Sequence, residues 1–322
     1  MEKINETPLM RRDITYIDGV QLEEAVEITR HCFFRDDEME LVEREIHNPE
    51  EFKKAYEEWI KYWNFERCLS EMHAYTGKEM FYYYGNCGVC NSPQPFIVDY
   101  QYAESDEGGR KRPNWRERLV CPNCGCNSRE RFMIDKIFSQ YKAGQKVLMY
   151  EQCSNVFEKV RREIPSVCGF EYPGEGYFGD ANVGEICCED ICDLSYDDGA
   201  FDILAVNDTF VLTYDYEKAF REAYRVLKSG GKMFFTVPFD GNSVETARRA
   251  ELTENGIVYT AGEWFYGNAI NADHPRPVYQ VFGWDMLETL KMCGFSVAVG
   301  KVYYGLKKGY LGYLPLYFEA VK

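Results

Sequence analysis

The feature of this chain that most restricts its fold is an alternation of strand-like and helix-like segments from residue 146 to the C-terminus. Short apolar runs are separated by segments whose apolar residues recur with helical spacing. The expected strands cover residues 146–150, 166–170, 185–188, 201–206, 232–237, 296–300 and 316–321. Strands that alternate with helices predict an α/β fold with a doubly wound, seven-stranded Rossmann-like sheet.

Capping residues mark several of the expected helices. Asn48, followed by a proline and two glutamates, predicts a helix start, and Ser128 and Asp215 are expected to cap two further helices. Gly294 is expected to end a helix that begins near residue 284. The first 80 residues read as mainly helical, with a weaker helix around residues 22–33.

Two C-x2-C pairs lie between residues 81 and 127, where helical periodicity is lost. Cys87 and Cys90 form the first pair, and Cys121 and Cys124 form the second. Two such pairs supply the four thiolates of a tetrahedral Zn²⁺ site, and the absence of an export signal favours metal ligands over disulfides. We expect a structural zinc ion; an iron–sulfur cluster or four unrelated thiols are the alternatives. Cys126 is a candidate substitute ligand.

The sequence thus predicts three parts: a helical segment (1–80), a small zinc ribbon (81–127) and a sheet domain (128–322). An insertion at about 241–283 separates the fifth strand from the next helix, and its Asn, Gly, Tyr and Trp content suits a substrate lid. His274 lies in this insertion and is a candidate catalytic residue; a solvated loop histidine is the alternative.

Composition limits the class of partner. Lys and Arg number 37 against 53 Asp and Glu, so the net charge of −16 argues against nucleic acid as the main partner. No apolar run is long enough to cross a membrane, and the N-terminus does not resemble a signal peptide, which predicts a cytoplasmic protein without a membrane partner. The arginine-rich run at 110–118 is either a site for an anionic sugar or phosphate or a solvated loop. Nothing in the sequence indicates an oligomeric state.

Two acidic residues follow successive expected strands. Glu171 comes after the second strand, and Asp190 follows the cysteine-containing third strand. Ligands of open α/β sheets bind beyond the carboxyl ends of the strands. A nucleoside cofactor needs an acid for its ribose hydroxyls and a polar group for its adenine edge, so these residues are candidates for both; ordinary loop carboxylates are the alternative.

The segments 193–204, Asn207–Asp208 and 215–231 resemble class I S-adenosylmethionine-dependent methyltransferases. The resemblance extends from about residue 146 to the C-terminus. Residues 114–122 and 127–131 are similar to the subgroup that has an N-terminal four-cysteine zinc ribbon. The resemblance implies S-adenosylmethionine as cofactor and S-adenosylhomocysteine as product.

The resemblance also implies roles for individual residues. The ribose-binding acid corresponds to Glu171, the adenine contact to Asp190 with Ile191, and the residues facing the methyl donor to Asn207 and Asp208. The remaining cofactor contacts that it implies are Tyr150, Glu151, Gln152, Cys153 and Tyr172.

The chain departs from the family pattern at two places. The first loop, 151–155, lacks the usual glycines, and Glu151 stands where backbone normally approaches the cofactor. We expect its carboxylate to favour the positively charged cofactor. After the fourth strand, Val211 and Leu212 replace an acid and a histidine.

These observations predict an O-methyltransferase that acts on a small molecule or glycan, with Asp208 as candidate base for a hydroxyl acceptor. The alternative is a non-catalytic cofactor-binding or interaction scaffold. The residues do not identify the acceptor.

Overall fold

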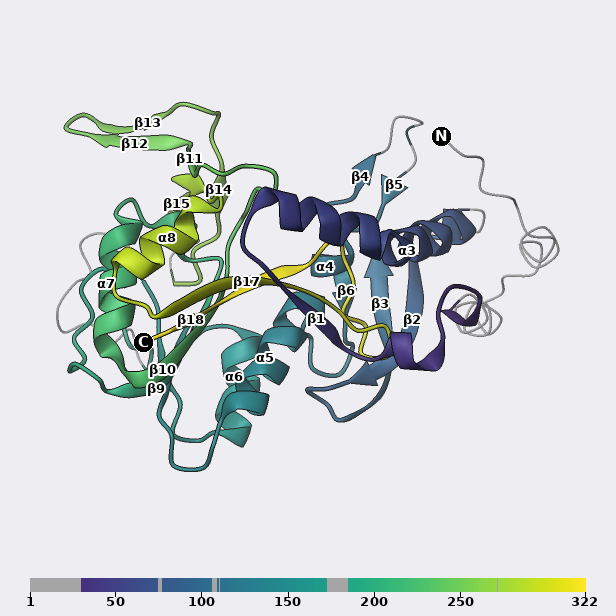
Figure 1. The fold of residues 1–322 in the computed structure, drawn as a ribbon, viewed down its shortest axis with the longest axis horizontal. Coiled ribbons are helices and arrows are strands. Elements are labelled where there is room, and N and C mark those ends of the chain that lie inside the picture. Colours follow the sequence, from purple (N-terminus) through teal and green to yellow (C-terminus); the bar gives the residue numbers. More distant parts are fainter. Residues whose placement is uncertain (1–29, 75–76, 106–108, 110, 173–184, 271) are drawn as a thin grey trace. The chain divides into compact units, whose positions relative to one another are not determined.

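The computed structural model describes residues 30–74, 77–105, 109, 111–172, 185–270 and 272–322 (Figure 1). The chain forms two compact units. Unit 1 contains the chain up to Glu43 together with Tyr56–Phe132 and Tyr303–Pro315, and unit 2 contains Arg44–Ala55, Met133–Val302 and Leu316–Lys322. This division differs from the three sequence ranges, since 303–315 fall in unit 1 and 44–55 fall in unit 2. Most of the expected helix at 22–33 lies outside the described residues.

A seven-stranded mixed sheet dominates unit 2 and confirms the expected fold class. Its order is β1-β17-β18-β10-β9-β7-β8. The strands are β1 (Val42–Ile46), β7 (Val147–Tyr150), β8 (Cys168–Phe170), β9 (Phe201–Asn207), β10 (Leu227–Thr236), β17 (Val297–Tyr304) and β18 (Leu316–Val321). Strands β8, β7, β9 and β10 are mutually parallel, whereas β18 runs antiparallel to both β10 and β17.

Helices cover both faces of this sheet. The connection from β7 to β8 passes through α6 (Asn155–Glu163), and that from β9 to β10 passes through α7 (Tyr216–Val226). The two connections step in opposite directions across the sheet, so right-handed crossovers place α6 and α7 on opposite faces. Figure 1 shows them on opposite sides of β9 and β10. The sheet is therefore doubly wound. A further helix of this unit, α8 (Asp285–Met292), precedes β17 in the chain.

The expected third strand, 185–188, is not a regular strand. A bridge pairs Cys188 with Glu171, supported by hydrogen bonds from Glu171 N to Cys187 O (2.8 Å) and from Glu189 N to Glu171 O (2.9 Å). The Gln152 side-chain amide takes backbone partners that a longer ladder would use: it donates to Glu185 O and accepts from Cys187 N, both at 2.9 Å. The seventh strand is instead β1, at the opposite edge.

Helix starts follow the expected caps with one exception. Asn48 Oδ1 accepts from Glu51 N (2.9 Å) at the start of α3 (Pro49–Ala74), and Asp215 caps α7. The cap of α5 (Ser128–Gln140) is Asn127, not Ser128. Asn127 and Glu130 form a reciprocal capping box, whereas the Ser128 hydroxyl bonds to the backbone of Leu311.

Unit 1 is built around a small antiparallel sheet of order β2-β3-β6. Its strands are β2 (Met80–Cys87), β3 (Ser92–Asp99) and β6 (Leu119–Val120); the unit also contains η2 (Asp36–Met39), β4 (Glu104–Ser105), β5 (Lys111–Arg112) and α4 (Trp115–Arg118). The fully buried Arg131 guanidinium lies 3.9 Å above the Phe96 ring and donates to Gly309 O (2.9 Å). This charged group therefore ties the 303–315 segment into the unit.

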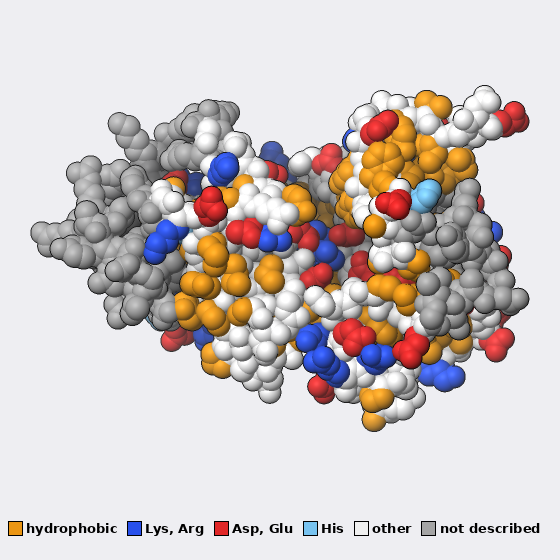
Figure 2. Space-filling view, turned by 180° about the vertical axis from the view of Figure 1, so that it is seen from behind, with side chains coloured by type: hydrophobic (Ala, Val, Ile, Leu, Met, Phe, Trp, Pro, Cys, Tyr) orange, Lys and Arg blue, Asp and Glu red, His pale blue; other side chains and the backbone are white. Residues whose placement is uncertain are grey.

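The insertion between β10 and α8 forms three two-stranded ribbons in unit 2. They pair β11 (Ala247–Arg248) with β16 (Gln280–Val281), β12 (Ala250–Thr253) with β13 (Gly256–Tyr259), and β14 (Phe265–Tyr266) with β15 (Arg276–Pro277). Figure 2 shows hydrophobic side chains gathered on the insertion, at the upper right, and the exposed ones include Val244, Leu252, Val258 and Phe265. Among the helices of the described residues, none is both long and apolar enough to traverse a membrane.

Candidate functional site

The predicted cofactor residues meet at the carboxyl-terminal edge of the parallel strands. Glu151 follows β7, Glu171 follows β8, and Asn207 is the last residue of β9. The order of the sheet reverses between β7 and β9, and such switch points form the ligand crevice of open α/β sheets. Asn207 Nδ2 donates to Glu151 Oε2 across this point, at 3.2 Å. The two residues thus define the centre of the site.

The backbone is strained at this edge. Glu151 has φ +73° and Asp208 has φ +48°, both in the left-handed region that non-glycine residues rarely adopt. Each residue directly follows a parallel strand, and Asp208 N is held by Thr236 O at 2.8 Å. Strain of this kind concentrates at functional sites. Glu151 therefore adopts a left-handed turn conformation that a glycine would adopt more easily.

Glu171 supports the first loop from β8. Its side chain is only 4% exposed, and its Oε1 accepts a hydrogen bond from Cys153 N at 2.9 Å. Burial raises the pKa of the Glu171 carboxyl, while the guanidinium of Arg276 acts in the opposite direction. The bridge between Glu171 and Cys188 brings the 188–190 segment to the same edge. Glu171 is thus a buried acid that links two loops of the site.

The remaining predicted contacts surround this centre. Asp190 is half-buried, and its Oδ1 accepts from Cys192 N (2.8 Å), which shapes the turn that buries Ile191. Tyr172 is half-buried next to Glu171, whereas Cys153 is exposed at the start of α6. The candidate base Asp208 is 9% exposed.

Arg276 reaches this site although sequence reasoning did not identify it. It lies in β15 of the insertion, and its Nη1 donates to the hydroxyl of Tyr150, the buried last residue of β7. The predicted catalytic residue of the insertion, His274, is instead exposed in the bend before β15. Only the register of the β14–β15 ribbon determines which of these side chains turns inward, and no motif in the sequence marks it.

Three buried polar atoms at this edge have no hydrogen-bond partner within the described part of the chain: Asn207 Oδ1, Thr236 Oγ1 and Arg276 Nε. Thr236 ends β10 and pairs in register with Asn207. Buried polar atoms in proteins are nearly always hydrogen-bonded, to protein, water or a ligand. The edge therefore fits a polar ligand that offers both donors and acceptors, as an amino-acid-bearing nucleoside does.

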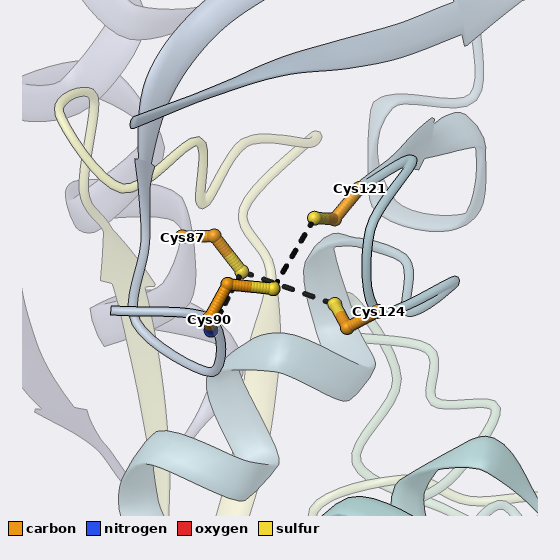
Figure 3. A group of neighbouring side chains, drawn as sticks. All are labelled: Cys87, Cys90, Cys121 and Cys124. Carbon is orange, nitrogen blue, oxygen red and sulfur yellow. Dashed lines mark hydrogen bonds between the residues drawn. The ribbon is translucent and has the colours of Figure 1, made fainter. Parts of the chain in front are cut away.

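A second candidate site lies in unit 1, at the end of the β2–β3 hairpin. Cys87 and Cys90 come from the hairpin turn, and Cys121 and Cys124 from the loop after β6. Figure 3 shows the four sulfur atoms facing one another from these two turns. All four lie within 4.8 Å of one another, and this is the one such metal-binding group among the described residues.

The sulfur spacing fits a tetrahedral metal. Cys87 Sγ is 3.9 Å from Cys124 Sγ, and Cys90 Sγ is 3.8 Å from Cys121 Sγ. Zinc–sulfur bonds of about 2.3 Å place tetrahedral ligands about 3.8 Å apart, whereas a disulfide requires about 2.0 Å. Cys126 is not a member of this group; its sulfur lies 3.7 Å from Cys124 O. The cysteine cluster can therefore hold a Zn²⁺ ion.

One segment of unit 2 is similar in sequence to a known family. Residues 170–235 match the sequence profile of a family described as "Methyltransferase domain". The chain is 46% identical over 50 residues to a sarcosine/dimethylglycine N-methyltransferase from Halorhodospira halochloris, a match that covers 16% of this chain and 18% of that protein. It is 43% identical over 88 residues to an arsenite methyltransferase from Aquipseudomonas alcaligenes, covering 26% and 23%.

These matches are confined to one part of each protein, since the chain spans about a fifth of the length of the curated relatives it matches. Among solved structures, an S-adenosylmethionine-dependent methyltransferase from Thermotoga maritima, described as a possible histamine N-methyltransferase, is 16% identical. The match covers 59% of this chain and 87% of that protein, with a TM-score of 0.34. The matched segment 170–235 runs from β8 to β10 and includes Glu171, Asp190 and Asn207. Residues 170–235 of unit 2 therefore resemble a methyltransferase domain.

Proposed function

We propose that this protein binds S-adenosylmethionine at the carboxyl-terminal edge of β7, β8 and β9 and transfers its methyl group to an acceptor. The observation that carries the proposal is the set of Glu151, Glu171 and Asn207 at the switch point. Glu171 and Asn207 also lie in the segment that matches the methyltransferase family. The unpartnered Asn207 Oδ1, Thr236 Oγ1 and Arg276 Nε support it, because a bound ligand with donors and acceptors would satisfy them.

Each residue has a defined role in this proposal. Glu171 would accept hydrogen bonds from the ribose hydroxyls, and Asp190 with Ile191 would contact the adenine. Glu151 and Asn207 would hold the methionine end, whose ammonium and sulfonium charges a carboxylate favours. The cofactor, when bound, supplies an electrophilic methyl group, and the enzyme's main contribution is to align it with the acceptor.

The acceptor in this proposal is a hydroxyl group of a small molecule or glycan. Asp208 is the candidate base, because it is mostly buried and directly follows Asn207. The acceptor would bind between this edge of the sheet and the insertion. The hydrogen bond from Arg276 to Tyr150 supports this location, because it holds the β14–β15 ribbon next to β7. Asp208 also lies in the segment 170–235, which matches the methyltransferase family.

Calorimetry of the full chain with S-adenosylmethionine and S-adenosylhomocysteine tests cofactor binding. We expect both to bind, and Glu171→Gln to weaken both by about tenfold or more, the cost of a lost charged hydrogen bond. Glu158→Gln is the matched control, because Glu158 is an exposed acid of α6 that pairs with Arg161. Absence of heat with either ligand would refute the enzyme and the cofactor-binding scaffold together. Binding without methyl transfer to any member of a hydroxyl-bearing acceptor panel would favour the scaffold.

We also propose that Cys87, Cys90, Cys121 and Cys124 hold one structural zinc ion. The sulfur spacing supports this assignment, and four protein ligands would leave no open position for chemistry. Metal analysis should find one zinc per chain, and Cys121→Ser should lose it while Cys126→Ser keeps it. Iron in place of zinc, or equal metal content in Cys121→Ser and the native chain, would contradict the proposal.

A further inference from the structure

Unit 1 contains a cleft of about 410 Å³ that belongs to neither site described above. Its walls come from the middle of α3, from Glu104 of β4, from residues 112–116, and from the loop at residues 312–313. All of its lining residues lie in unit 1. The volume is within the range of about 300–1,000 Å³ that small-molecule sites occupy.

Aromatic rings form part of the wall. Trp63 of α3 is half-buried, Trp115 of α4 is 5% exposed, and Tyr313 is 58% exposed. Trp115 is fixed by edge-on packing against Phe81, with ring centroids 5.7 Å apart. Trp115 is therefore a buried support of the wall, and Trp63 and Tyr313 provide the exposed aromatic surface. Aromatic surface of this kind packs against weakly apolar ligand surfaces, such as the C–H face of a sugar ring.

The cleft also contains three guanidinium groups. Arg67, Arg112 and Arg116 line the cleft, and its carboxylates are Glu66 and Glu104. The Arg112 guanidinium lies 4.8 Å above the Trp63 ring. Stacking uses the face of a guanidinium, whereas carboxylate and phosphate oxygens bind at its edge. Arg67 and Arg116 each pair with a carboxylate, Glu71 and Glu117 respectively. The five N–H donors of a guanidinium allow it to bind a second anionic group as well.

Two further groups of the cleft bear on its ligand. Arg67 donates from Nη1 to Glu71 (3.0 Å), while its buried Nε has no hydrogen-bond partner among the described residues. Glu66 is 4% exposed and accepts from Gly312 N at 2.8 Å. Burial raises the pKa of the Glu66 carboxyl to about 8, so it is mainly protonated and uncharged at pH 7. Glu66 therefore adds no negative charge to the cleft at neutral pH.

We propose that this cleft binds an acidic sugar, a single pyranose ring that bears a carboxylate or a phosphate. The aromatic rings would take the C–H face of the sugar, and the arginines would take its anionic group through paired N–H donors. A neutral sugar would form no ion pair with the arginines, and an inorganic anion would not pack against the aromatic rings. The proposal does not depend on the methyltransferase activity, because none of these residues belongs to the cofactor site.

Titration of the full chain with glucuronate, glucose 6-phosphate, glucose and inorganic phosphate, followed by ligand-observed NMR, tests the proposal. We expect at least one of the two acidic sugars to bind more tightly than glucose and inorganic phosphate. The stronger of the two identifies the anionic group. Failure of both acidic sugars at millimolar concentration, or equal binding of glucose or phosphate, would overturn the proposal.

Two adjacent residues of β5 provide a matched pair of variants. Arg112→Gln should weaken binding of the acidic sugar by about tenfold or more, the usual cost of a lost charged hydrogen bond. Lys111→Gln removes the same charge from the neighbouring exposed position, which does not line the cleft, and should change affinity by less than about twofold. Trp63→Phe, which keeps an apolar ring, should weaken both sugars without a loss of folding. Equal effects of the two β5 variants would assign the binding to general surface charge and overturn the site.

Discussion

At the scale of single residues, Glu151 combines two properties that substitution can separate. Its φ of +73° costs about 1–3 kcal/mol, and its carboxylate accepts from Asn207 Nδ2. Glu151→Gly should relieve the strain and raise the free energy of unfolding by about 1 kcal/mol. Glu151→Gln should keep the strain and remove only the charge. Urea unfolding of both variants checks this pair, and a glycine variant no more stable than the glutamine variant would contradict it.

The glutamine variant also tests how Glu151 acts on the cofactor. Glu151→Gln should weaken S-adenosylmethionine more than S-adenosylhomocysteine, because only the former carries a charged sulfur. Calorimetric titration with both ligands measures the difference. Equal weakening would restrict the carboxylate to an ammonium contact, and unchanged affinity for both would place Glu151 outside the site.

Glu66 gives unit 1 a pH-dependent stability. Its pKa is about 8 in the folded chain against 4.5 for an ordinary glutamate, so unfolding releases its proton between these values. Stability should therefore fall as pH rises from about 4.5 to 8, by roughly 1.4 kcal/mol per pH unit at most. Glu66→Gln removes this ionisation and should be more stable than the native chain at pH 8, with little difference at pH 5. Glu57→Gln, an exposed position of the same helix, serves as control; a gain independent of pH would show that ionisation is not the cause.

At the scale of elements, the sequence predicted those helices and strands whose positions depend on local periodicity and capping. The parallel strands β7, β8 and β9 lie within two residues of their expected bounds, and α7 and α8 begin at or next to their expected starts. Strand β10, however, begins five residues before the strand that was expected at 232–237. The prediction of a third strand at 185–188 was wrong. The side-chain amide of Gln152, which is distant in sequence, forms hydrogen bonds with the backbone of this segment in place of a neighbouring strand. The spacing of the four cysteines predicted their cluster, since all ligands lie in two short turns.

Arg276 was missed for a similar reason: the inward direction of its side chain depends on how the insertion folds back. It links the β14–β15 ribbon to Tyr150, and a charged hydrogen bond of this kind is worth about 1.5–3 kcal/mol. Arg276→Ala should therefore speed hydrogen exchange in residues 264–279 and weaken S-adenosylmethionine by about tenfold or more. Arg249→Ala is the control, because Arg249 contacts Trp264 and Ala261 within the insertion. Similar effects of both variants would show that the insertion has only a general structural role.

At the scale of the whole molecule, the two units share continuous secondary structure. The helices α3 and α5 and the strands β1 and β17 each begin in one unit and end in the other. We therefore expect loss of one unit to disrupt the elements that the two units share. This connectivity predicts one cooperative unfolding transition for the described chain, although the proposed metal lies in unit 1 alone.

Zinc loss tests that coupling. Removal of one ligand by Cys121→Ser should lower the midpoint of the whole transition in scanning calorimetry, because structural zinc contributes directly to folding free energy. S-adenosylmethionine binds in unit 2 under our proposal, and by mass action it should raise the midpoint of the same transition. Cys32→Ser, at an exposed thiol, should leave the midpoint unchanged. If Cys121→Ser instead splits the trace into two transitions, and the cofactor shifts only the upper one, the units unfold independently. The shared elements would then not transmit stability between them.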